Sequence, residues 1–462
     1  MNYFSIGGEL EIKLPQDCIN STVKELIYGF LYRSVNVRYV DSDVCEVIIG
    51  SATPCGYSGD GIISVTETGA FIGGRDERAL LTYLFMALSE ISPECLDKGK
   101  ELLFLPCRHD EFSPALSRRM LHVCLFPRIP LSTYKKIIRL AGVLGFTHLI
   151  LEFWGTLKYD CLNELAWKNE SFTKSEIAEL IEEMRSLHIQ PIPMINHFGH
   201  ASASRMAFGK HVVLDQNPRL ATLFSNDGWW WRFDKQCVRE LLKSMRSELY
   251  GLFGKGEYFH IGFDESFSYP TDEAASSALC DYVGDICREI ISEGRIPLLW
   301  GDLFLHEKSV GIKAGMGYEG NCISAEMSEK MIRSLPSDVV ICDWQYFVKQ
   351  APWVSTEYFR SKGVKVMVCP WFDKVGVDTA IATAGEFDCF GMIQTTWDKL
   401  FAPGTLSFLF NTYYTIFGID RSLPKTGSNL ANASLLRKIW FADGDYESAG
   451  WLRLDVSSTL TI

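Results

Sequence analysis

The sequence lacks the features that define several large classes of protein. Its 14 cysteines include no Cys-x-x-Cys pair, which argues against a zinc ribbon or a thioredoxin-like redox site. No stretch of about 18 uncharged apolar residues occurs, so we expect no membrane-spanning helix. The first residues, MNYFSIGGELEIKLP, contain no basic segment followed by an apolar one. We therefore expect no secretory signal, and we predict a cytoplasmic location.

Positive charge is scarce, and glycine-rich phosphate motifs are missing. The chain carries 45 Lys and Arg against 57 Asp and Glu, a formal net charge of −12. Such a chain repels polyanions on average, so we expect no binding to nucleic acid. No dinucleotide-binding fingerprint follows a predicted strand. We expect neither a cofactor nor a metal ion.

Apolar and aromatic residues are abundant. Apolar residues make up 47% and charged residues 22% of the chain, which is typical of a globular protein and excludes a disordered or coiled-coil one. The 12 tryptophans offer flat apolar faces to a ligand as well as to a core. Cys124, Cys342 and Cys369 lie inside apolar runs, so we predict buried free thiols in a reducing compartment.

Residues 1–112 are predicted to form a small α/β domain. GELEIKL and CEVIIGS have the pattern of strands, and GIISVTETGAFIGG has the pattern of two strands joined by a turn. Residues 21–32 and the segment DERALLTYLFMALSEI have helical periodicity. The polar segment CRHDEFSPALSR, residues 107–118, is predicted to be a linker.

Residues 113–425 repeat a strand followed by a helix. The eight predicted strands are MLHVCLF, THLILEF, QPIPMIN, EYFHIGF, RIPLLW, DVVICDW, VKVMVCP and GMIQTTW. Helical stretches such as TYKKIIRLAGVLG and KSEIAELIEEMRSLH separate them. Eight such units predict an α/β fold with a (β/α)8 TIM barrel, and an open doubly wound sheet is the alternative. Residues 426–462 are predicted to be a C-terminal helix and tail that pack on the barrel.

The residues that end these strands are candidates for an active site, because such a barrel places its site at the C-terminal ends of its strands. Carboxylates and tryptophans alternate there. Aromatic faces stack on sugar rings and carboxylates bind hydroxyl groups, so this rim indicates a carbohydrate ligand. In chain order the candidates are Glu152, Trp154, Asn196, His197, His200, Asp264, Glu265, Trp300, Asp302, Asp343, Trp344, Tyr346, Trp371, Asp373, Trp397 and Asp398.

Each candidate also has a structural interpretation. A Trp that ends a strand can pack under a loop, and Asp302 and Asp373 can each cap the helix that follows. His197 and His200 have the spacing of metal ligands, but they follow a strand and no third ligand is evident. The WWWR segment, residues 229–232, can form an outer sugar platform or pack a loop on the barrel.

Asp264 and Glu265 are the sharpest feature of the sequence. Two adjacent acids after the apolar run YFHIGF are costly unless both have a use. Like charges close together raise the pKa of one carboxyl group, which keeps it protonated near neutral pH. Where a strand breaks into a loop, both side chains can reach one pocket. A plain surface loop is the alternative.

These residues resemble family 20 of the glycoside hydrolases, the β-N-acetylhexosaminidases. The family's run His-x-Gly-Gly-Asp-Glu reads here HIGFDE, residues 260–265, with Phe263 in place of the second glycine. NHFGHAS resembles the family's Pro-Gly-His-Ser segment, and His200 matches its histidine. GMIQTTWDK resembles the strand that ends in Trp-Thr-Glu, with Trp397 matching the tryptophan and Lys399 in place of the glutamate. The resemblance covers the chain from near residue 40 to near residue 420.

The resemblance implies an exo-acting, retaining hydrolase that removes terminal β-linked N-acetylglucosamine or N-acetylgalactosamine by substrate-assisted catalysis. Glu265 would act as general acid and then as base, and Asp264 would hold the acetamido group. The family's tyrosine is missing after the seventh strand, and Tyr346 either supplies the hydroxyl in its place or belongs to the core. With the strand-end residues, the predicted substrate-binding set is Arg118 (or Arg119), Glu152, His200, Trp300, Trp344, Tyr346, Trp371, Asp373, Trp397 and Asp398.

Two other functions stay open. The departures at Phe263 and Lys399 and the missing tyrosine are compatible with a barrel that binds amino sugars without cleaving them. A metal-dependent barrel hydrolase would use His197 and His200. In the leading hypothesis the partner is a small molecule or oligosaccharide that ends in N-acetylhexosamine.

Overall fold

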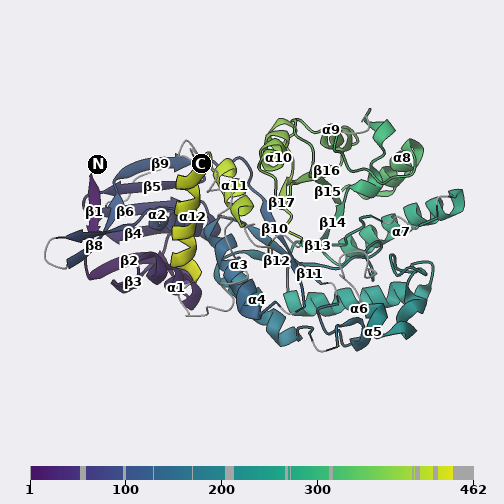
Figure 1. Ribbon diagram of the computed structural model, residues 1–462, viewed down its shortest axis with the longest axis horizontal. Helices are drawn as coiled ribbons and strands as arrows, with labels where there is room; N and C mark the ends of the chain where they lie inside the picture. The colour runs from purple at the N-terminus through teal and green to yellow at the C-terminus, as the bar shows by residue number, and fades with distance from the viewer. Residues whose placement is uncertain are drawn as a thin grey trace.

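The chain folds into a closed barrel with a smaller sheet-rich unit at one end (Figure 1). This computed structural model describes residues 2–52, 59–96, 100–127, 129–153, 155–168, 170–202, 213–265, 269–270, 272–311, 316–397, 400, 406–419 and 425–440. The eight strands of the barrel are parallel and follow one another in chain order. The predicted fold, a (β/α)8 barrel preceded by a small α/β unit, is confirmed.

The small unit contains two sheets and two helices. The larger sheet has the order β3-β2-β4-β6-β5-β9, and the smaller one the order β1-β8-β7. The bounds are β1 Tyr3–Ile6, β2 Glu9–Pro15, β3 Asn36–Ser42, β4 Glu46–Gly50, β5 Gly61–Thr66, β6 Gly69–Gly74, β7 Ser92–Leu96, β8 Lys100–Pro106, β9 Arg108–Phe112, α1 Ser21–Phe30 and α2 Glu77–Ser89. Helix α2 is buried almost throughout and lies against β5 and β6.

The segment predicted to be a linker is partly a strand. Strand β9 pairs with β5 at the edge of the larger sheet. Its side chains alternate between half-buried and exposed, which is the pattern of an edge strand with one face in water. The charged side chains of the exposed face concealed this strand in the sequence.

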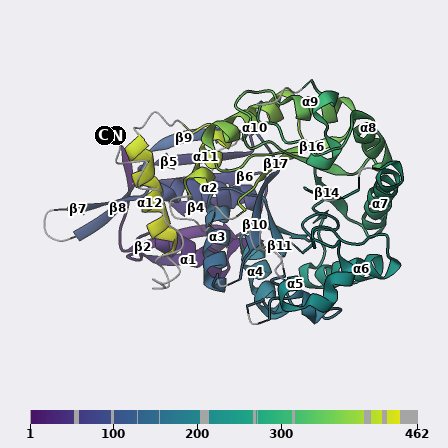
Figure 2. The same cartoon turned by 45° about the vertical axis from the view of Figure 1, so that its right-hand side comes forward.

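All eight predicted barrel strands are present, and helices surround them (Figure 2). The strands are β10 Arg119–Leu125, β11 His148–Phe153, β12 Gln190–Met194, β13 Tyr258–His260, β14 Ile296–Trp300, β15 Val340–Trp344, β16 Lys365–Cys369 and β17 Gly391–Gln394. The helices are α3 Leu131–Val143, α4 Lys174–Ser186, α5 Val213–Gln216, α6 Gln236–Phe253, α7 Glu273–Ser292, α8 Ala325–Ser334, α9 Val354–Ser361, α10 Lys374–Glu386, α11 Ser407–Ile416 and α12 Lys425–Trp440.

The barrel interior is a packed core that becomes polar towards the C-terminal ends of its strands. Met120, Ile150, Val340 and Met367 belong to one buried apolar cluster inside the barrel. Side chains that alternate with these along each strand pack outwards against the helices. Parallel strands covered on both faces are therefore almost continuously apolar, as the sequence is.

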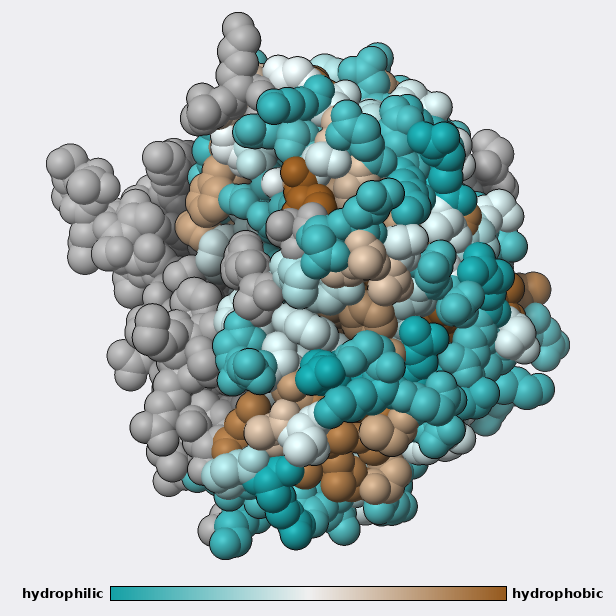
Figure 3. Space-filling view, turned by 90° about the vertical axis from the view of Figure 1, so that its right-hand side faces the viewer, coloured by the Kyte–Doolittle hydropathy of each residue, from teal (hydrophilic) through white to brown (hydrophobic). Residues whose placement is uncertain are grey.

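The three cysteines predicted to be buried free thiols, Cys124, Cys342 and Cys369, are buried and free. Across the described part of the chain, no helix combines the length and apolarity needed to span a membrane. The barrel face remote from the small unit is largely hydrophilic, with hydrophobic residues gathered in patches (Figure 3).

Helix α12 connects the two units instead of packing on the barrel alone. It contacts α3 of the barrel and α1 of the small unit (Figure 1). The ammonium of Lys438 donates hydrogen bonds to the carbonyl oxygens of Ser89 and Ile91, and burial lowers its pKa to about 8. The predicted tail, residues 441–462, lies outside the described residues. The predicted domain boundaries near residues 112 and 425 stay a prediction.

A buried arginine joins α6, α7 and the loop after β12. The guanidinium of Arg246 is fully buried and lies 3.0 Å from Glu289 and 3.1 Å from Glu293. Its Nη1 also lies 3.2 Å from Nε2 of His197. On the same pair of helices, Lys243 makes an exposed ion pair with Glu289.

We expect Arg246→Met to lower the free energy of unfolding by about 3 kcal/mol, because it leaves two carboxylates without their buried cation. Lys243→Met is the matched control on the same helix. It should change the free energy of unfolding far less, because water screens its exposed ion pair. Urea denaturation of the three proteins measures both effects. Equal losses in the two variants would contradict the importance of the buried pair.

Candidate active site

The acid pair lies where β13 breaks into a left-handed loop. The strand ends at His260, three residues before the end of the predicted strand. Gly262, Phe263 and Glu265 then adopt φ angles of 71°, 78° and 45°. This backbone buries the carboxylate of Asp264 and leaves the Glu265 side chain one-third exposed. The two neighbours therefore reach the same site but occupy different environments.

Phe263 holds a backbone conformation that glycine adopts more easily. A φ of 78° in a residue with a side chain costs about 1–3 kcal/mol. The ring is fully buried and packs on Phe198 and Tyr282, with centroids 5.4 and 5.9 Å away. These buried aromatic contacts help to offset the strain of the left-handed conformation.

His200 joins the two acids. Its Nε2 lies 2.9 Å from Oε2 of Glu265 and 3.4 Å from Oδ2 of Asp264. Next to it, a Cβ on Gly199 would lie 1.9 Å from the carbonyl oxygen of Asp264, so only glycine fits there. The loop after β12 is therefore pressed against the loop after β13, and this contact brings His200 to the acids.

The WWWR segment supports the acid pair from outside. The indole N–H of Trp229 donates a hydrogen bond to the carbonyl oxygen of Glu265, and its ring lies 4.8 Å from that of His200. Trp231 is buried and donates to the carbonyl oxygen of Asn196. Of the two interpretations, the structure therefore favours packing of the loop on the barrel.

Asp302 fixes the backbone of Glu265. Its Oδ2 accepts hydrogen bonds from the Glu265 N–H and from Asn321, at 3.0 and 2.8 Å, and its Oδ1 accepts one from Trp344 at 3.0 Å. The side chain caps no helix, so the capping alternative for Asp302 is wrong. Burial, with a smaller contribution from the charge of Glu265, raises the pKa of Asp302 to about 6.

Glu319 is a site residue that the sequence did not indicate. Burial, and then the charges of Glu265 and Asp302, raise the pKa of its carboxyl group. Gln345 holds its backbone by accepting from the Glu319 N–H at 2.7 Å and donating to its carbonyl oxygen at 3.1 Å. Glu319 lies in a long loop after β14, so no strand-end position marked it.

The predicted aromatic residues form one continuous wall. Ring centroids are 5.7 Å apart for Trp300 and Trp397, 4.9 Å for Trp344 and Tyr346, and 5.2 Å for Tyr346 and Trp371. The indole N–H of Trp397 donates to the hydroxyl of Tyr346 at 2.7 Å. Trp300 is fully buried, whereas Trp371 and Trp397 are partly exposed. Trp300 therefore lies at the base of this wall and the partly exposed rings lie above it.

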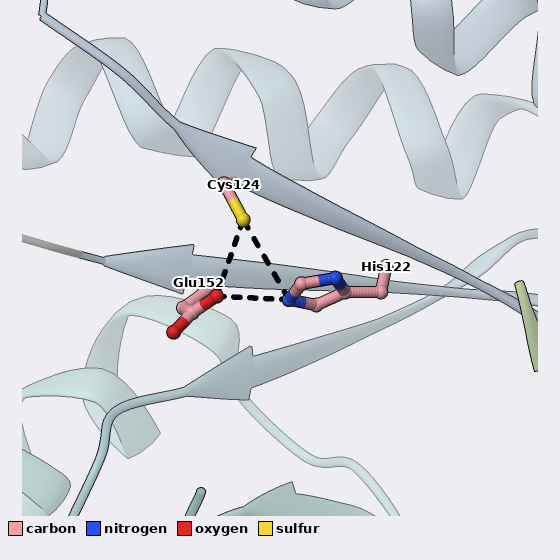
Figure 4. A group of neighbouring side chains, drawn as sticks. All are labelled: His122, Cys124 and Glu152. Atoms are coloured by element: carbon pink, nitrogen blue, oxygen red, sulfur yellow. Dashed lines mark hydrogen bonds and ion pairs between the residues drawn. The ribbon is translucent and has the colours of Figure 1, made fainter. Parts of the chain in front are cut away.

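Glu152 is engaged by two residues of the neighbouring strand β10 (Figure 4). Its Oε2 lies 2.9 Å from Nε2 of His122 and 3.2 Å from Sγ of Cys124, and its Oε1 is 3.5 Å from Nδ2 of Asn196. The side chains of Glu152, His122 and Cys124 are fully buried. In the sequence, His122 and Cys124 were two members of an apolar run, and only their i, i+2 spacing indicates that both face inwards.

The sugar-binding role predicted for Arg118, or for Arg119, is wrong. Arg119 is the first residue of β10 and Arg118 precedes it, so both lie about 20 Å or more along the chain from the C-terminal end of the strand. Arg118 donates to the hydroxyl of Tyr258, the first residue of β13, and its guanidinium stacks on Phe390. Arg119 donates to the carbonyl oxygen of Gly145. Spacing along the sequence did not show which end of the barrel they occupy.

Two predicted strand-end acids have structural partners. Asp373 caps α10 by accepting from the N–H of Gly376 at 2.8 Å, and it forms an ion pair with Lys349. The helix cap considered for Asp373 is therefore present, and its contact with sugar stays a prediction. Asp343 is buried and accepts a hydrogen bond from the hydroxyl of Thr356 at 2.6 Å.

His197 and His200 do not form a metal site. Nε2 of His197 faces Arg246 on α6, whereas His200 faces the acid pair. Burial and the charge of Arg246 lower the pKa of His197 to about 3. The metal-dependent alternative based on these two histidines is therefore wrong.

Three residues weighed from the sequence lie outside the described residues. They are Trp154, Asp398 and Lys399. The sugar contact predicted for Asp398 stays a prediction.

The fold is shared with solved family 20 glycoside hydrolases. The exo-β-N-acetylglucosaminidase of Vibrio harveyi, solved with N-acetylglucosamine, has a TM-score of 0.64 at 13% identity, over 96% of this chain and 75% of its own. The β-N-acetylhexosaminidase of Bacteroides fragilis has a TM-score of 0.63 at 15% identity, over 96% and 94%. The family 20 β-N-acetylhexosaminidase of Streptomyces coelicolor A3(2) has a TM-score of 0.61 at 15% identity, over 96% of this chain and 94% of its own. No protein-family model and no curated sequence matches the chain.

We expect Asp302→Asn to change how stability depends on pH. Because folding raises the pKa of Asp302 from about 3.8 to about 6, the wild type loses stability as pH rises through that interval. An asparagine cannot ionise. The free energy of unfolding of the variant, relative to that of wild type, should therefore rise by up to about 3 kcal/mol as the pH rises between these two pKa values. Urea denaturation over a pH series measures the difference.

Asp373→Asn is the control for this experiment. The pKa of Asp373 is lowered by Lys349 and the helix N-terminus, so its contribution is lost only as pH falls. The difference in free energy of unfolding between Asp373→Asn and wild type should not depend on pH above about pH 4. Parallel curves for Asp302→Asn and wild type would contradict a buried carboxyl group with a raised pKa.

Proposed function

We propose that the protein is an exo-acting, retaining β-N-acetylhexosaminidase that removes terminal β-linked N-acetylglucosamine or N-acetylgalactosamine. The main evidence for this proposal is the arrangement of Asp264 and Glu265 around His200. Asp264 is buried, Glu265 is one-third exposed, and Nε2 of His200 lies within 3.4 Å of both. The similar enzyme of Vibrio harveyi was solved with N-acetylglucosamine, which supports this class of substrate.

The different environments of the two acids support different roles. Glu265, at the accessible position, protonates the glycosidic oxygen as the bond to the anomeric carbon breaks. The acetamido oxygen of the substrate attacks that carbon and forms an oxazolinium ion. Asp264, buried beside it, accepts a hydrogen bond from the acetamido N–H and stabilises the positive charge. The Glu265 carboxylate then takes a proton from a water molecule that attacks the anomeric carbon and opens the oxazolinium ring. The configuration at that carbon is retained.

Tyr346 supports this mechanism from the aromatic wall. Burial keeps the pKa of its hydroxyl well above its ordinary value, so the proton stays on the oxygen. The hydroxyl accepts a hydrogen bond from Trp397, and Asp264 is near enough to act on it electrostatically. We assign this hydroxyl to the acetamido oxygen, and the flanking rings to the apolar faces of the sugar.

Glu265→Gln should lower kcat for the 4-nitrophenyl N-acetyl-β-glucosaminide by about 10²–10⁴-fold, because the amide cannot donate the proton. The loss should be smaller with a 2,4-dinitrophenyl leaving group, which needs little protonation. A thiazoline mimic of the oxazolinium ion should still bind the variant, as calorimetry would show.

Two results would contradict the proposal. Cleavage of a plain β-glucoside as fast as of the acetamido sugar would remove the substrate's own acetamido group from the mechanism. Binding of N-acetylglucosamine by wild-type protein with no turnover of any aryl glycoside would instead favour the non-catalytic barrel.

Tyr346→Phe tests the hydroxyl without removing the ring. We expect kcat to fall by about 10²-fold, since one donor to the developing charge is lost. The melting temperature should stay close to that of wild type because the aromatic packing remains. If kcat is unchanged, Tyr346 has only a packing role.

A further inference from the structure

A second cluster of chemically active side chains lies inside the barrel. It consists of His122 and Cys124 on β10 and Glu152 on β11 (Figure 4). Each side chain offers one metal-binding atom, and all three are fully buried. The proposed mechanism uses neither His122 nor Cys124.

The three atoms have the spacing of one face of a metal tetrahedron. The distances are 2.9 Å from Nε2 of His122 to Oε2 of Glu152, 3.2 Å from that oxygen to Sγ of Cys124, and 3.8 Å from Sγ to Nε2. Zinc bonds of about 2.0–2.3 Å at tetrahedral angles place such atoms about 3.3–3.6 Å apart. The observed edges differ from these values by about 0.4 Å or less, so small adjustments would admit the ion.

The set of donors selects the class of metal. A thiolate and an imidazole are ligands of zinc and related transition metals, whereas calcium and magnesium take oxygen ligands. A Cys-His-carboxylate set supplies two negative charges, which balance a divalent cation. The ion would neutralise a carboxylate that otherwise lies buried between a thiol and an imidazole.

Two more buried nitrogen donors lie near the cluster. His260 and Trp300 lie inside the barrel beside His122, and the His260 and Trp300 rings are 4.4 Å apart. Nε2 of His260 and Nε1 of Trp300 are buried, and neither has a hydrogen-bond partner among the described residues. Buried N–H groups without partners are costly, which indicates that water or a bound ligand meets them.

We propose that His122, Cys124 and Glu152 bind one divalent transition-metal ion of the zinc type. Three protein ligands leave a fourth position for water or a ligand oxygen. The ring of Trp397, a member of the aromatic wall, lies 4.8 Å from that of His122, so the ion lies next to the proposed sugar site. The site does not depend on the proposed hydrolase activity, because the test below measures the metal alone.

Cobalt(II) is the probe for this site. Titration of the full chain should saturate at one equivalent and produce a thiolate-to-cobalt charge-transfer band, with the strong visible bands of four-coordinate cobalt. Zinc should displace the cobalt and abolish both the charge-transfer band and the visible bands. Cys124→Ser should abolish the charge-transfer band, whereas Cys369→Ser, which removes another buried thiol of the barrel interior, should retain it.

Glu152→Gln provides a second variant in case Cys124→Ser does not fold. It keeps the shape of the side chain and removes one anionic ligand, so cobalt affinity should fall at least about 100-fold. The proposal is overturned if wild-type protein shows no charge-transfer band with excess cobalt, or if the band persists in Cys124→Ser. Either result would leave a hydrogen-bonded cluster in which the thiol and the imidazole donate to Glu152.

Discussion

The candidate site depends on the close contact between the loops that follow β12 and β13. At Gly199 there is no room for a Cβ against the carbonyl oxygen of Asp264, and at Gly262 there is none against the side chain of Asn196. Two glycines thus let two loops from neighbouring strands touch. The contact sets the left-handed backbone that separates Asp264 from Glu265, and it brings His200 between them.

Repulsion among neighbouring carboxyl groups explains why neutral hydrogen-bond donors surround this contact. Glu265, Asp302 and Glu319 repel one another, and burial adds to the cost of ionising Asp302 and Glu319. The carboxylate of Asp302 accepts three hydrogen bonds, from an amide N–H, from Asn321 and from Trp344. The proposed mechanism needs one protonated acid near neutral pH. Such repulsion favours it, because it raises the free energy of ionising all three carboxyl groups together.

The differences between this chain and the family 20 motifs that its sequence resembles have different consequences. Phe263 adopts a left-handed φ of 78°, which glycine adopts more easily, and its buried ring packs on Phe198 and Tyr282. The arginine departure is larger, since Arg118 and Arg119 both lie at the N-terminal end of the barrel. Instead, the C-terminal half of β10 presents His122 and Cys124, so the chemistry of this strand differs from what the resemblance implied.

The barrel, its eight strands and the acid pair could be predicted from the sequence, because strands buried between the packed barrel interior and the surrounding helices need apolar runs that end abruptly in polar residues. It also predicted the aromatic residues of the wall. The folded structure was needed to show which end of the barrel each arginine occupies. It also showed that Asp302 supports Glu265 while Asp373 caps a helix. Glu319 and the partners of Glu152 also came from tertiary contacts, since loops and neighbouring strands join residues whose spacing in the chain carries no signal.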